Sequence, residues 1–263
     1  MKKIQIYQVD AFTDKLFKGN PAAVCILEEW LSDEIMQSIA AENNLAETAF
    51  IIPIDKSYAI RWFTPTVEVD LCGHATLATA YVLFNCLGYR DPEIMFYSTK
   101  SGVLIVSQQN GILFLDFPTD TVNEITVTDQ IIACLQMKPL KVYKGKTDYV
   151  ALLESEEEVQ DLHPDLNKVS ELKARGLIVT AKGKTVDFVS RFFAPQSGVI
   201  EDPVTGSAHT TLIPIWSQKL GKKEMIATQL SERGGKLICI YKGDRCLIGG
   251  SSKLFLTGEI NIE

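Results

Sequence analysis

The feature that most constrains this chain is an internal repeat, in which three motifs recur in the same order. The matched pairs are RWFTP with RFFAP, DLCGHAT with EDPVTGSAHTT, and KSGVLIV with RGGKLIC. Gly73 and Gly206 in the second pair lie 133 positions apart, and the same spacing separates Lys100 from Arg233 in the third pair. The first pair lies 130 positions apart, so one small insertion separates the copies. Ordered motifs at a constant spacing indicate two copies of one structural unit.

Each copy contains short runs rich in β-branched residues, joined by tight turns, which is typical of strands. The first copy has a strong two-residue hairpin signal at Asn110-Gly111, and the second turns at Gly243-Asp244. From Ala75 to Phe84 a helical run carries no charged residue, so this helix must be buried. The pattern predicts an α+β fold with an internal duplication of two similar domains. Each domain is expected to be a curved mixed sheet wrapped around a central buried helix.

The segment FPTDTVNEITVT interrupts the pattern, and the predicted domain boundary lies near Pro118–Thr128. The prediction is an N-terminal α+β domain over residues 1–118 and a C-terminal α+β domain over 119–263. The last strand, about 252–263, is a candidate addition to the first domain.

Composition excludes several classes of protein. The net charge is −7 and no run of Lys or Arg forms a basic face, which argues against binding to nucleic acid or to anionic membranes. No stretch approaches the roughly 18 unbroken apolar residues of a membrane span, and no apolar signal core follows the first lysines. A cytoplasmic protein is expected. The six cysteines form no CxxC pair and the three histidines no HxxxH motif, so we expect reduced thiols and no metal.

The starts of the two central helices are candidate anion-binding positions. The first turn of a helix presents unpaired N–H groups and about half a positive charge. Gly73 allows a ligand to approach the backbone and His74 can donate another hydrogen bond, while Gly206 and Ser207 do the same in the second copy. Two such helix starts facing one cleft would bind a carboxylate without a cofactor. Pro214, several residues into the second helix, is expected to kink or shorten it.

Glu47 is a candidate proton carrier because it begins a strand and shares a face with apolar Ala49 and Ile51. Burial favours the neutral form of a carboxyl group, which suits proton transfer near neutral pH. The pattern alone favours the alternative, a solvent-exposed glutamate at a strand end.

Three more polar residues stand near the helix starts. His74 is either a general acid/base or substrate donor, or an imidazole satisfied by the backbone. Asp70 and Asp202 could orient a substrate or act as carboxylates attracted by the helix dipole, and the dipole interpretation is favoured for Asp70. Pro203 strengthens the case for Asp202 because it fixes an extended approach to the second helix.

Two nucleophile hypotheses are weak. Ser207 and His209 are two positions apart on a helix and do not face each other, so Ser207 is a better helix cap and ligand donor than a nucleophile. Cys72 could be a thiol base, but a two-base racemase needs a second thiol, and Thr205 occupies the matching position. Packing is the better interpretation of Cys72.

Together these motifs resemble the phenazine-biosynthesis isomerase (PhzF) family, relatives of diaminopimelate epimerase. The resemblance rests on GNPAAV (Gly19–Val24), NLAETAF (Asn44–Phe50), RWFTPTVEVDLCGHATLATA (Arg61–Ala80), EDPVTGSAH (Glu201–His209) and QLSERGGKL (Gln229–Leu237). These segments span nearly the whole chain in the family's order. The resemblance implies two similar α+β domains with the active site in the cleft between them.

The resemblance also implies a cofactor-free isomerase that is a homodimer and acts on a small carboxylate-bearing substrate. In the family's phenazine enzyme a glutamate moves a proton between carbons of trans-2,3-dihydro-3-hydroxyanthranilate. Glu47 matches that glutamate, and the substrate-binding residues fall on His74, Asp202 and Ser207, with backbone N–H groups from Gly73 and Gly206. Two alternatives stay open, namely an amino-acid racemase or epimerase of the same fold, and a non-catalytic protein that binds small acids.

Overall fold

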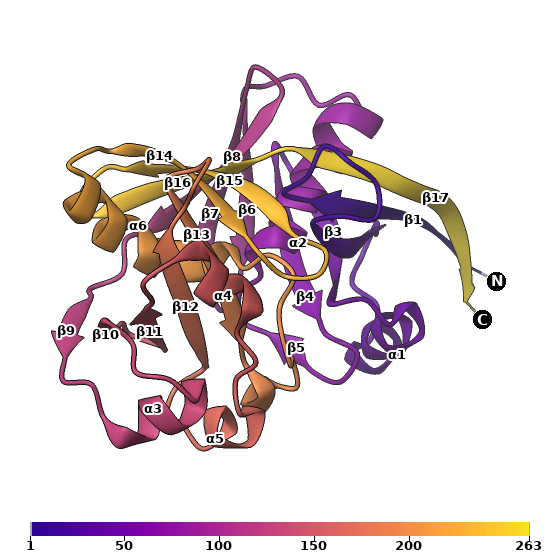
Figure 1. Cartoon of the computed structure of the whole chain (residues 1–263). Coiled ribbons are helices and arrows are strands. Elements are labelled where there is room, and N and C mark those ends of the chain that lie inside the picture. Colours follow the sequence, from indigo (N-terminus) through magenta and orange to yellow (C-terminus); the bar gives the residue numbers. More distant parts are fainter. Residues whose placement is uncertain (1, 263) are drawn as a thin grey trace. The chain divides into compact units, whose positions relative to one another are not determined.

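The computed structural model describes residues 2–262, which divide into two compact units (Figure 1). The first unit contains the chain up to Asp116 together with the segment from Gly249 onward, and the second contains Phe117–Ile248. The C-terminal strand therefore returns to the first unit, where it lies antiparallel beside the N-terminal strand.

The first unit is built on a mixed sheet. Its strands are β1 (Lys2–Ala11), β2 (Asn20–Ile26), β3 (Glu47–Ile54), β4 (Ser57–Phe63), β5 (Glu68–Val69), β6 (Glu93–Ser98), β7 (Gly102–Gln109), β8 (Ile112–Pro118) and β17 (Ser252–Ile262). β1 pairs antiparallel with β17 and β2, and β2 pairs parallel with β3. The sheet continues with β3–β4 antiparallel, β4–β6 parallel, and β6–β7 and β7–β8 antiparallel. The short β5 pairs with β4.

The second unit repeats this order. Its strands are β9 (Asn123–Ile125), β10 (Lys141–Lys144), β11 (Asp148–Leu152), β12 (Gly176–Lys182), β13 (Phe188–Phe193), β14 (Glu224–Gln229), β15 (Gly235–Tyr241) and β16 (Arg245–Gly250). β10–β11 is antiparallel, β11–β12 parallel, β12–β13 antiparallel, β13–β14 parallel and β14–β15 antiparallel. The alternation of parallel and antiparallel pairs matches that of the first unit, which confirms the predicted duplication and the fold class.

The register of the strands makes the two units comparable residue by residue. Arg61 on β4 pairs with Phe50 on β3, and its repeat partner Arg191 on β13 pairs with Val179 on β12. Phe50 and Val179 are therefore equivalent positions. Three residues earlier on the same strands, the position of Glu47 is occupied in the second unit by Gly176.

Both central helices begin at the glycine of the repeated motif. α2 (Gly73–Tyr81) is buried at every residue from His74 to Ala80 and packs against β1, β2 and β3. It continues directly into a π-helical segment, η1 (Val82–Cys86). In the second unit α6 (Gly206–Leu220) contacts β15, and its Trp216 donates a hydrogen bond to Thr180 on β12. The helix predicted to have no solvent-exposed face is thus the centre of its unit.

Pro214 does not shorten α6, contrary to the sequence-based expectation. The helix runs on to Leu220. Proline has no N–H to donate to the carbonyl four residues earlier, which belongs to Thr210. The backbone N–H of Asp120 donates to this carbonyl at 3.2 Å, so a loop outside the helix replaces the missing hydrogen bond.

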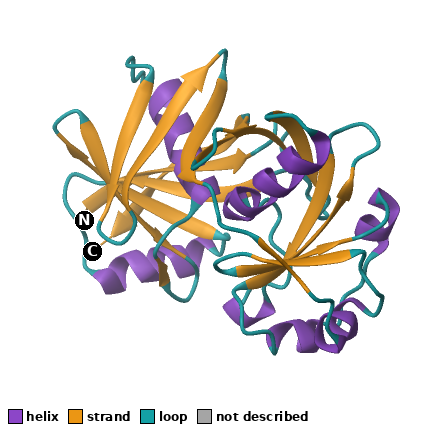
Figure 2. Cartoon of the chain, turned by 90° about the vertical axis from the view of Figure 1, so that its left-hand side faces the viewer, coloured by secondary structure: helices purple, strands orange, loops and turns teal. Residues whose placement is uncertain are grey.

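The remaining helices cover the outer faces of the sheets. They are α1 (Asp33–Asn43) in the first unit and α3 (Asp129–Leu135), α4 (Glu156–Asp161), α5 (Leu166–Ser170) and the 3-10 turn η2 (Pro195–Ser197) in the second. In Figure 2 the first unit, which carries both termini, has helices against its strands on more than one side. Met36 and Ile39 of α1 join a core cluster with Phe50 and Phe63. α3, α4 and α5 supply Ile131, Val159 and Val169 to a separate cluster.

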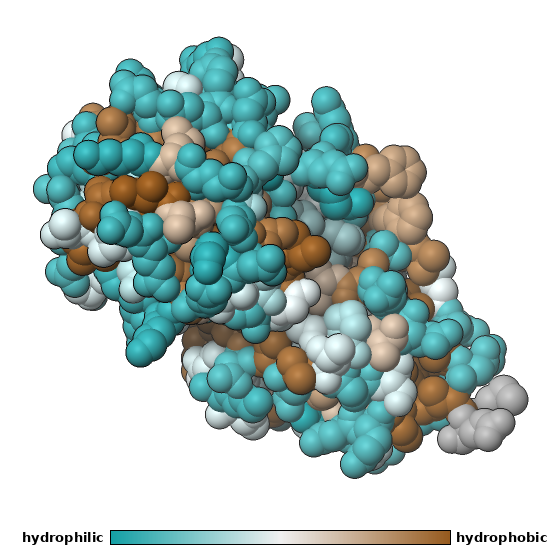
Figure 3. Space-filling view, turned by 60° about the horizontal axis from the view of Figure 1, so that its bottom comes forward, coloured by the Kyte–Doolittle hydropathy of each residue, from teal (hydrophilic) through white to brown (hydrophobic). Residues whose placement is uncertain are grey.

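The surface of the first unit carries an apolar groove whose lining includes none of the predicted site residues. Its volume is about 520 Å³, and Ile35, Ile39, Ile260 and Ile262 contribute to its lining. Figure 3, which brings the lower side of Figure 1 forward, shows brown hydrophobic side chains among teal hydrophilic ones. Within residues 2–262 no helix is long and apolar enough to cross a membrane.

Candidate active site

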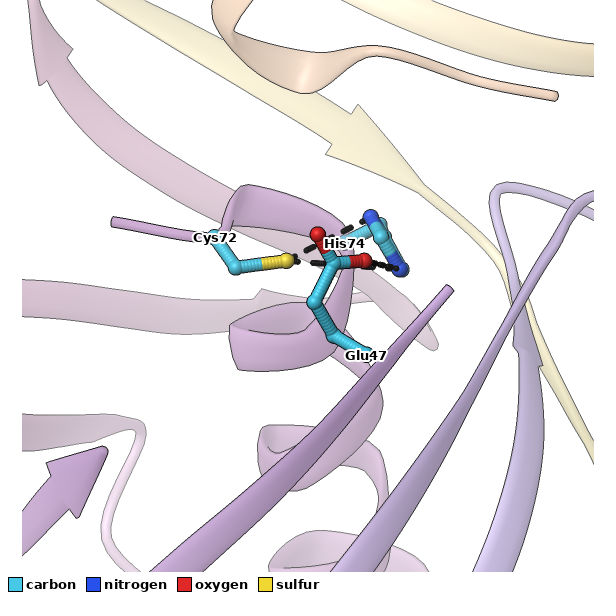
Figure 4. Close-up of side chains that lie close together, drawn as sticks. All are labelled: Glu47, Cys72 and His74. Carbon is cyan, nitrogen blue, oxygen red and sulfur yellow. Dashed lines mark hydrogen bonds and ion pairs between the residues drawn. The ribbon is translucent and has the colours of Figure 1, made fainter. Parts of the chain in front are cut away.

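Three chemically reactive side chains meet at the N-terminus of α2 (Figure 4). Glu47 Oε2 lies 3.1 Å from His74 Nε2. The Cys72 sulfur lies 3.5 Å from His74 Nδ1 and 4.0 Å from Nε2. The side chain of His74 is 6% exposed and that of Glu47 is 17% exposed, so solvent or a ligand reaches the cluster chiefly through the glutamate.

Local structure explains why these residues meet. Asn44 ends α1 in the left-handed conformation, with φ 49°, and the chain turns so that β3 begins at Glu47. Cys72 is the N-cap residue of α2 and has an extended backbone, which places His74 in the first turn. Asn20, at the start of β2, is fully buried and its amide nitrogen lies 3.2 Å from His74 Nδ1. The imidazole ring is therefore held between Asn20 and Glu47.

The environment acts on His74 in opposing directions. Burial alone lowers its pKa, but Cys72 and the Glu47 carboxylate raise it, and the net result is a pKa well above the ordinary histidine value. Burial, with a smaller contribution from Glu47, raises the pKa of the Cys72 thiol to about 11. At neutral pH the thiol is thus protonated, and we assign the charge that stabilises imidazolium to the Glu47 carboxylate.

The same three side chains could hold a metal ion. Glu47, Cys72 and His74 each offer one ligand atom, and these atoms lie within 4.8 Å of one another. Cysteine, histidine and carboxylate ligands suit Zn²⁺. Sequence spacing could not reveal this cluster, because Glu47 comes from a separate segment of the chain.

A second polar group surrounds the N-terminus of α6. The Ser207 hydroxyl accepts a hydrogen bond of 2.7 Å from Arg175 Nη1. The guanidinium group of Arg175 also pairs with both oxygens of Asp148, which is fully buried, and lies over the ring of Phe192. Asp148 thus fixes the arginine beside the serine.

The loop before α6 is held by a buried glutamine. Gln229, fully buried at the end of β14, accepts from the Thr205 N–H and donates to the Asp202 carbonyl. The Thr205 hydroxyl donates to the Asp202 carboxylate at 2.5 Å. Asp202 is therefore positioned from both its backbone and its side chain.

Side-chain caps distinguish the two central helices from the others. Ser32, Thr128, Ser155 and Asp165 each accept a backbone N–H at the start of α1, α3, α4 and α5. Neither Cys72 on α2 nor Thr205 on α6 makes such a side-chain cap bond. The glycine-led first turns of α2 and α6 thus lack the cap that satisfies N–H groups elsewhere.

The structure places the six predicted site residues in two groups. Glu47 and His74 are brought together beside Gly73 in the first unit. Asp202, Gly206 and Ser207 lie around the start of α6 in the second unit.

The structure adds to three secondary interpretations. Ser207 is not the cap of α6, because Thr205 occupies the N-cap position and Ser207 is the second residue of the helix. Asp70, interpreted as a carboxylate attracted by the helix dipole, has a side chain that is 76% exposed and pairs with Lys100 at 3.0 Å. Cys72 is buried as expected, yet it contacts His74 rather than only packing against apolar neighbours.

His209 is a core residue, in line with the rejection of a hydrolase. It is fully buried, its Nδ1 lies 2.8 Å from the Thr205 carbonyl, and burial lowers its pKa to about 4. Among the described residues its Nε2 has no hydrogen-bond partner.

Sequence reasoning missed Asn20, Arg175, Asp148 and Gln229 as members of these groups. Asn20 and Gln229 stand inside segments that carry the family resemblance, so a signal for them existed. Arg175 and Asp148 lie outside those segments, and only the pairing of β11 with β12 brings them near Ser207.

Comparison with known proteins agrees with this geometry. The family model described as phenazine biosynthesis-like protein matches residues 9–256. A Pseudomonas aeruginosa protein named an uncharacterized isomerase is 48% identical over 261 residues, covering 99% of each chain. The crystal structure of a PhzF-family protein from Enterococcus faecalis has a TM-score of 0.96 at 46% identity, covering 99% of this chain and 100% of that one.

A more distant likeness concerns the fold alone. A hydroxyproline epimerase from Agrobacterium vitis superposes with a TM-score of 0.62 at 9% identity, over 98% of this chain and 92% of that one. The repeated sheet, the buried central helices and the close sequence relatives agree. The chain therefore belongs to the phenazine biosynthesis-like protein family and is an enzyme of the isomerase class.

Proposed function

We propose that this isomerase moves a proton between two carbons of a small carboxylate-bearing substrate, without a cofactor, and that Glu47 is its only base. The observation that carries the proposal is the asymmetry of the repeat. The first unit has Glu47 where the second has Gly176. A single base that returns the proton it removes fits a shift within one molecule.

The second unit has no room for an equivalent base. A Cβ atom built on Gly176 would lie 2.5 Å from the Phe192 ring and 2.8 Å from the Phe193 carbonyl oxygen. The matching N-cap position holds Thr205 where the first unit has Cys72. A racemase that inverts a carbon with two bases, such as a pair of thiols, needs a second base in the second unit. The positions equivalent to Glu47 and Cys72 hold Gly176 and Thr205, so neither supplies that base.

The two oxygens of Glu47 have different surroundings. Oε2 is buried and faces His74 Nε2, so Oε1 is the oxygen available to a substrate. In the proposed reaction the carboxylate takes a proton from carbon, and the C–H electron pair moves into the adjacent unsaturated system. The neutral carboxyl group then returns the proton to another carbon of that system. The imidazolium of His74 stabilises the carboxylate at the start and the end of this cycle.

The remaining predicted residues bind the substrate in this proposal. The N–H groups at Gly73 and Gly206 and the Ser207 hydroxyl supply hydrogen bonds to acidic oxygens. Asp202 accepts from an amino or hydroxyl group of a substrate. The family resemblance favours trans-2,3-dihydro-3-hydroxyanthranilate or a similar cyclic acid as the substrate. A cytoplasmic homodimer is part of the same proposal.

The test is proton exchange in heavy water. Wild-type protein and Glu47→Gln are incubated with trans-2,3-dihydro-3-hydroxyanthranilate and, separately, with a metabolite extract, and deuterium uptake is read by mass spectrometry. Loss of a positioned base costs about 10³-fold, so the variant should lose exchange while keeping substrate affinity. Glu42→Gln, which changes an exposed carboxylate on α1, is the matched control. Exchange by Glu47→Gln at the wild-type rate contradicts the assignment.

The same experiment separates the alternatives. Proton shift gives a constitutional isomer as product. Racemisation or epimerisation gives deuterium at one carbon with loss of its configuration. A non-catalytic binding protein shows thermal stabilisation by the ligand and no exchange with either variant.

A further inference from the structure

The Ser207 hydroxyl has its direction set by its neighbour. A hydroxyl has one proton to donate and two lone pairs that accept. Arg175 has only donors, so in the 2.7 Å contact Ser207 Oγ must accept. The proton of Ser207 therefore points elsewhere.

Arg175 is held firmly enough to impose this direction. Its Nε and Nη2 pair with the two oxygens of Asp148, whose side chain has no exposed surface. Its guanidinium carbon lies 5.1 Å from the centre of the Phe192 ring. The side chain of Arg175 is nevertheless 36% exposed, so it is not closed off from solvent. Because the planar guanidinium group is already held by Asp148 and Phe192, it loses little conformational freedom when it binds a third group.

We propose that Arg175 is a positioning residue that makes Ser207 a hydrogen-bond donor to the substrate carboxylate. The inference rests on the proposed function and deepens it, because it assigns the carboxylate end of the substrate to the second unit. Ser207, the N–H groups of Arg175 that are not bonded to Asp148 or Ser207, and the uncapped first turn of α6 are all donors. A group that only accepts, such as a carboxylate, satisfies them, whereas a carboxamide would turn an NH₂ toward donors.

The first unit has no equivalent of this arginine. Arg175 precedes Gly176 as Ala46 precedes Glu47. The two copies of this strand start therefore differ: the first unit has the proposed base, Glu47, and the second has the cation Arg175 next to the equivalent position. Charge-assisted hydrogen bonds are stronger than neutral ones, so the cation gives the second unit a preference for an anionic group.

The test measures selectivity between two matched probes, anthranilate and anthranilamide, which differ in a carboxylate against a neutral carboxamide. Dissociation constants are measured by calorimetry for wild type, Ser207→Ala, Arg175→Gln and the double variant. Wild type should bind anthranilate at least about tenfold more tightly than anthranilamide. Each single variant should reduce this ratio about tenfold, and the double variant should lose little more, because both changes remove one coupled interaction.

Two further variants exclude a merely structural role. Lys173→Gln removes a nearby exposed positive charge and should keep the wild-type ratio. Arg175→Lys keeps a positive charge beside Asp148 but lacks the planar guanidinium group that fixes the direction of the Ser207 hydroxyl. Adding Ser207→Ala to Arg175→Lys should therefore change the selectivity ratio less than about threefold. Arg175→Lys also takes the place of Arg175→Gln if Arg175→Gln does not fold because Asp148 is left unpaired.

The outcomes decide the inference independently of catalysis, because no exchange is measured. Absence of a wild-type preference for anthranilate overturns it. So does unchanged selectivity in Arg175→Gln, or full additivity of the Arg175 and Ser207 changes. If selectivity behaves as expected while Glu47→Gln still exchanges protons, the proposed base is wrong and the carboxylate assignment stands.

Discussion

The N-termini of α2 and α6 are equivalent positions of one repeat, yet they carry different sets of groups. Around α2 stand a carboxylate, a thiol and an imidazole, all able to gain or lose a proton. Around α6 stand a fixed guanidinium group, a hydroxyl that accepts from it, and the carboxylates of Asp148 and Asp202. The helices themselves are alike, since both start at a glycine, lack a side-chain cap and are buried. The shared backbone supplies N–H donors, and the side chains decide what each copy adds.

The difference extends to the two buried histidines. His74 lies beside Cys72 and Glu47 and has a raised pKa, whereas Nδ1 of His209 lies 2.8 Å from a backbone carbonyl oxygen and its pKa is lowered to about 4. Burial lowers the pKa of both, so the polar neighbours reverse the result for His74. The two histidines are not at equivalent positions of the repeat, because Gly73 matches Gly206 and His74 therefore matches Ser207.

The largest expected effect concerns His209 and acid stability. Its folded-state pKa of about 4 lies below the ordinary value of 6.5, so as pH falls the unfolded chain gains the proton first. Stability should therefore fall between pH 6.5 and pH 4, by about 2 kcal/mol at pH 5 and about 3 kcal/mol at pH 4. Urea unfolding of wild type and His209→Gln over this range measures it. A pH dependence identical in the two proteins contradicts a neutral buried His209.

His74 should act in the opposite direction. Its folded-state pKa is raised, so its stabilising contribution is complete below about pH 6.5 and is lost as pH rises through the folded-state value. Between pH 6 and pH 9 the free energy of unfolding should therefore decrease by a smaller amount in His74→Gln than in wild type. Glu47→Gln should flatten the curve in the same way, because Glu47 supplies the charge. A steeper decline in either variant would contradict the ion pair.

The next largest effect concerns the space around Gly176. Gly176→Ala places a Cβ against the Phe192 ring and a backbone oxygen, and overpacking of this kind costs about 1–3 kcal/mol. Denaturant unfolding measures the loss, with Ala46→Gly as a control at a neighbouring position of the other repeat. If Gly176→Ala is as stable as wild type, steric exclusion cannot explain why the second unit has no base.

A smaller effect distinguishes the repeated arginines. Arg61 and Arg191 each form a two-bond pair with a glutamate, Glu68 and Glu201, and lie over a phenylalanine ring. Arg191 also donates to three carbonyls near the end of α4. Arg191→Lys should cost about 2 kcal/mol and Arg61→Lys about 1 kcal/mol, because lysine cannot replace the fork. Arg61 has its own extra partner, because it also donates to the exposed carboxylate of Asp33 at 2.9 Å. Equal losses in unfolding measurements would show that the carbonyl contacts of Arg191 contribute no more than this pair.

Local patterns were enough to predict much of this fold. The start of β3 at Glu47 and the turn at Asn110-Gly111 between β7 and β8 follow from short runs of residues. The burial of α2 follows from the absence of charged residues between Ala75 and Phe84. The continuation of α6 past Pro214 could not be predicted from local patterns. The hydrogen bond that replaces the one lost at Pro214 comes from Asp120, more than ninety residues away.

The same limit applies to the candidate site. Glu47, His74, Asp202 and Ser207 stand in recognisable motifs, so they could be named from the sequence. Their partners could not all be named, since Asp148 and Arg175 reach Ser207 only after β11 and β12 have paired. The contact of Cys72 with His74 depends on the extended backbone at the N-cap, which no composition pattern reveals.

The smallest effect expected is that of Cys72→Thr, which gives α2 the N-cap residue of α6. The thiol has a pKa of about 11 and is protonated at neutral pH, so it is a poor base in this environment. Threonine keeps most of the volume but changes the contact with His74, and we expect proton exchange to fall by about threefold to tenfold.

That loss is far below the roughly 10³-fold expected for Glu47→Gln. The proton-exchange assay compares the two variants directly, with Glu42→Gln, at an exposed position of α1, as the control. A Cys72→Thr variant as inactive as Glu47→Gln would make the thiol an acid/base partner. The functional difference between the two helix starts would then rest on the thiol as much as on the carboxylate.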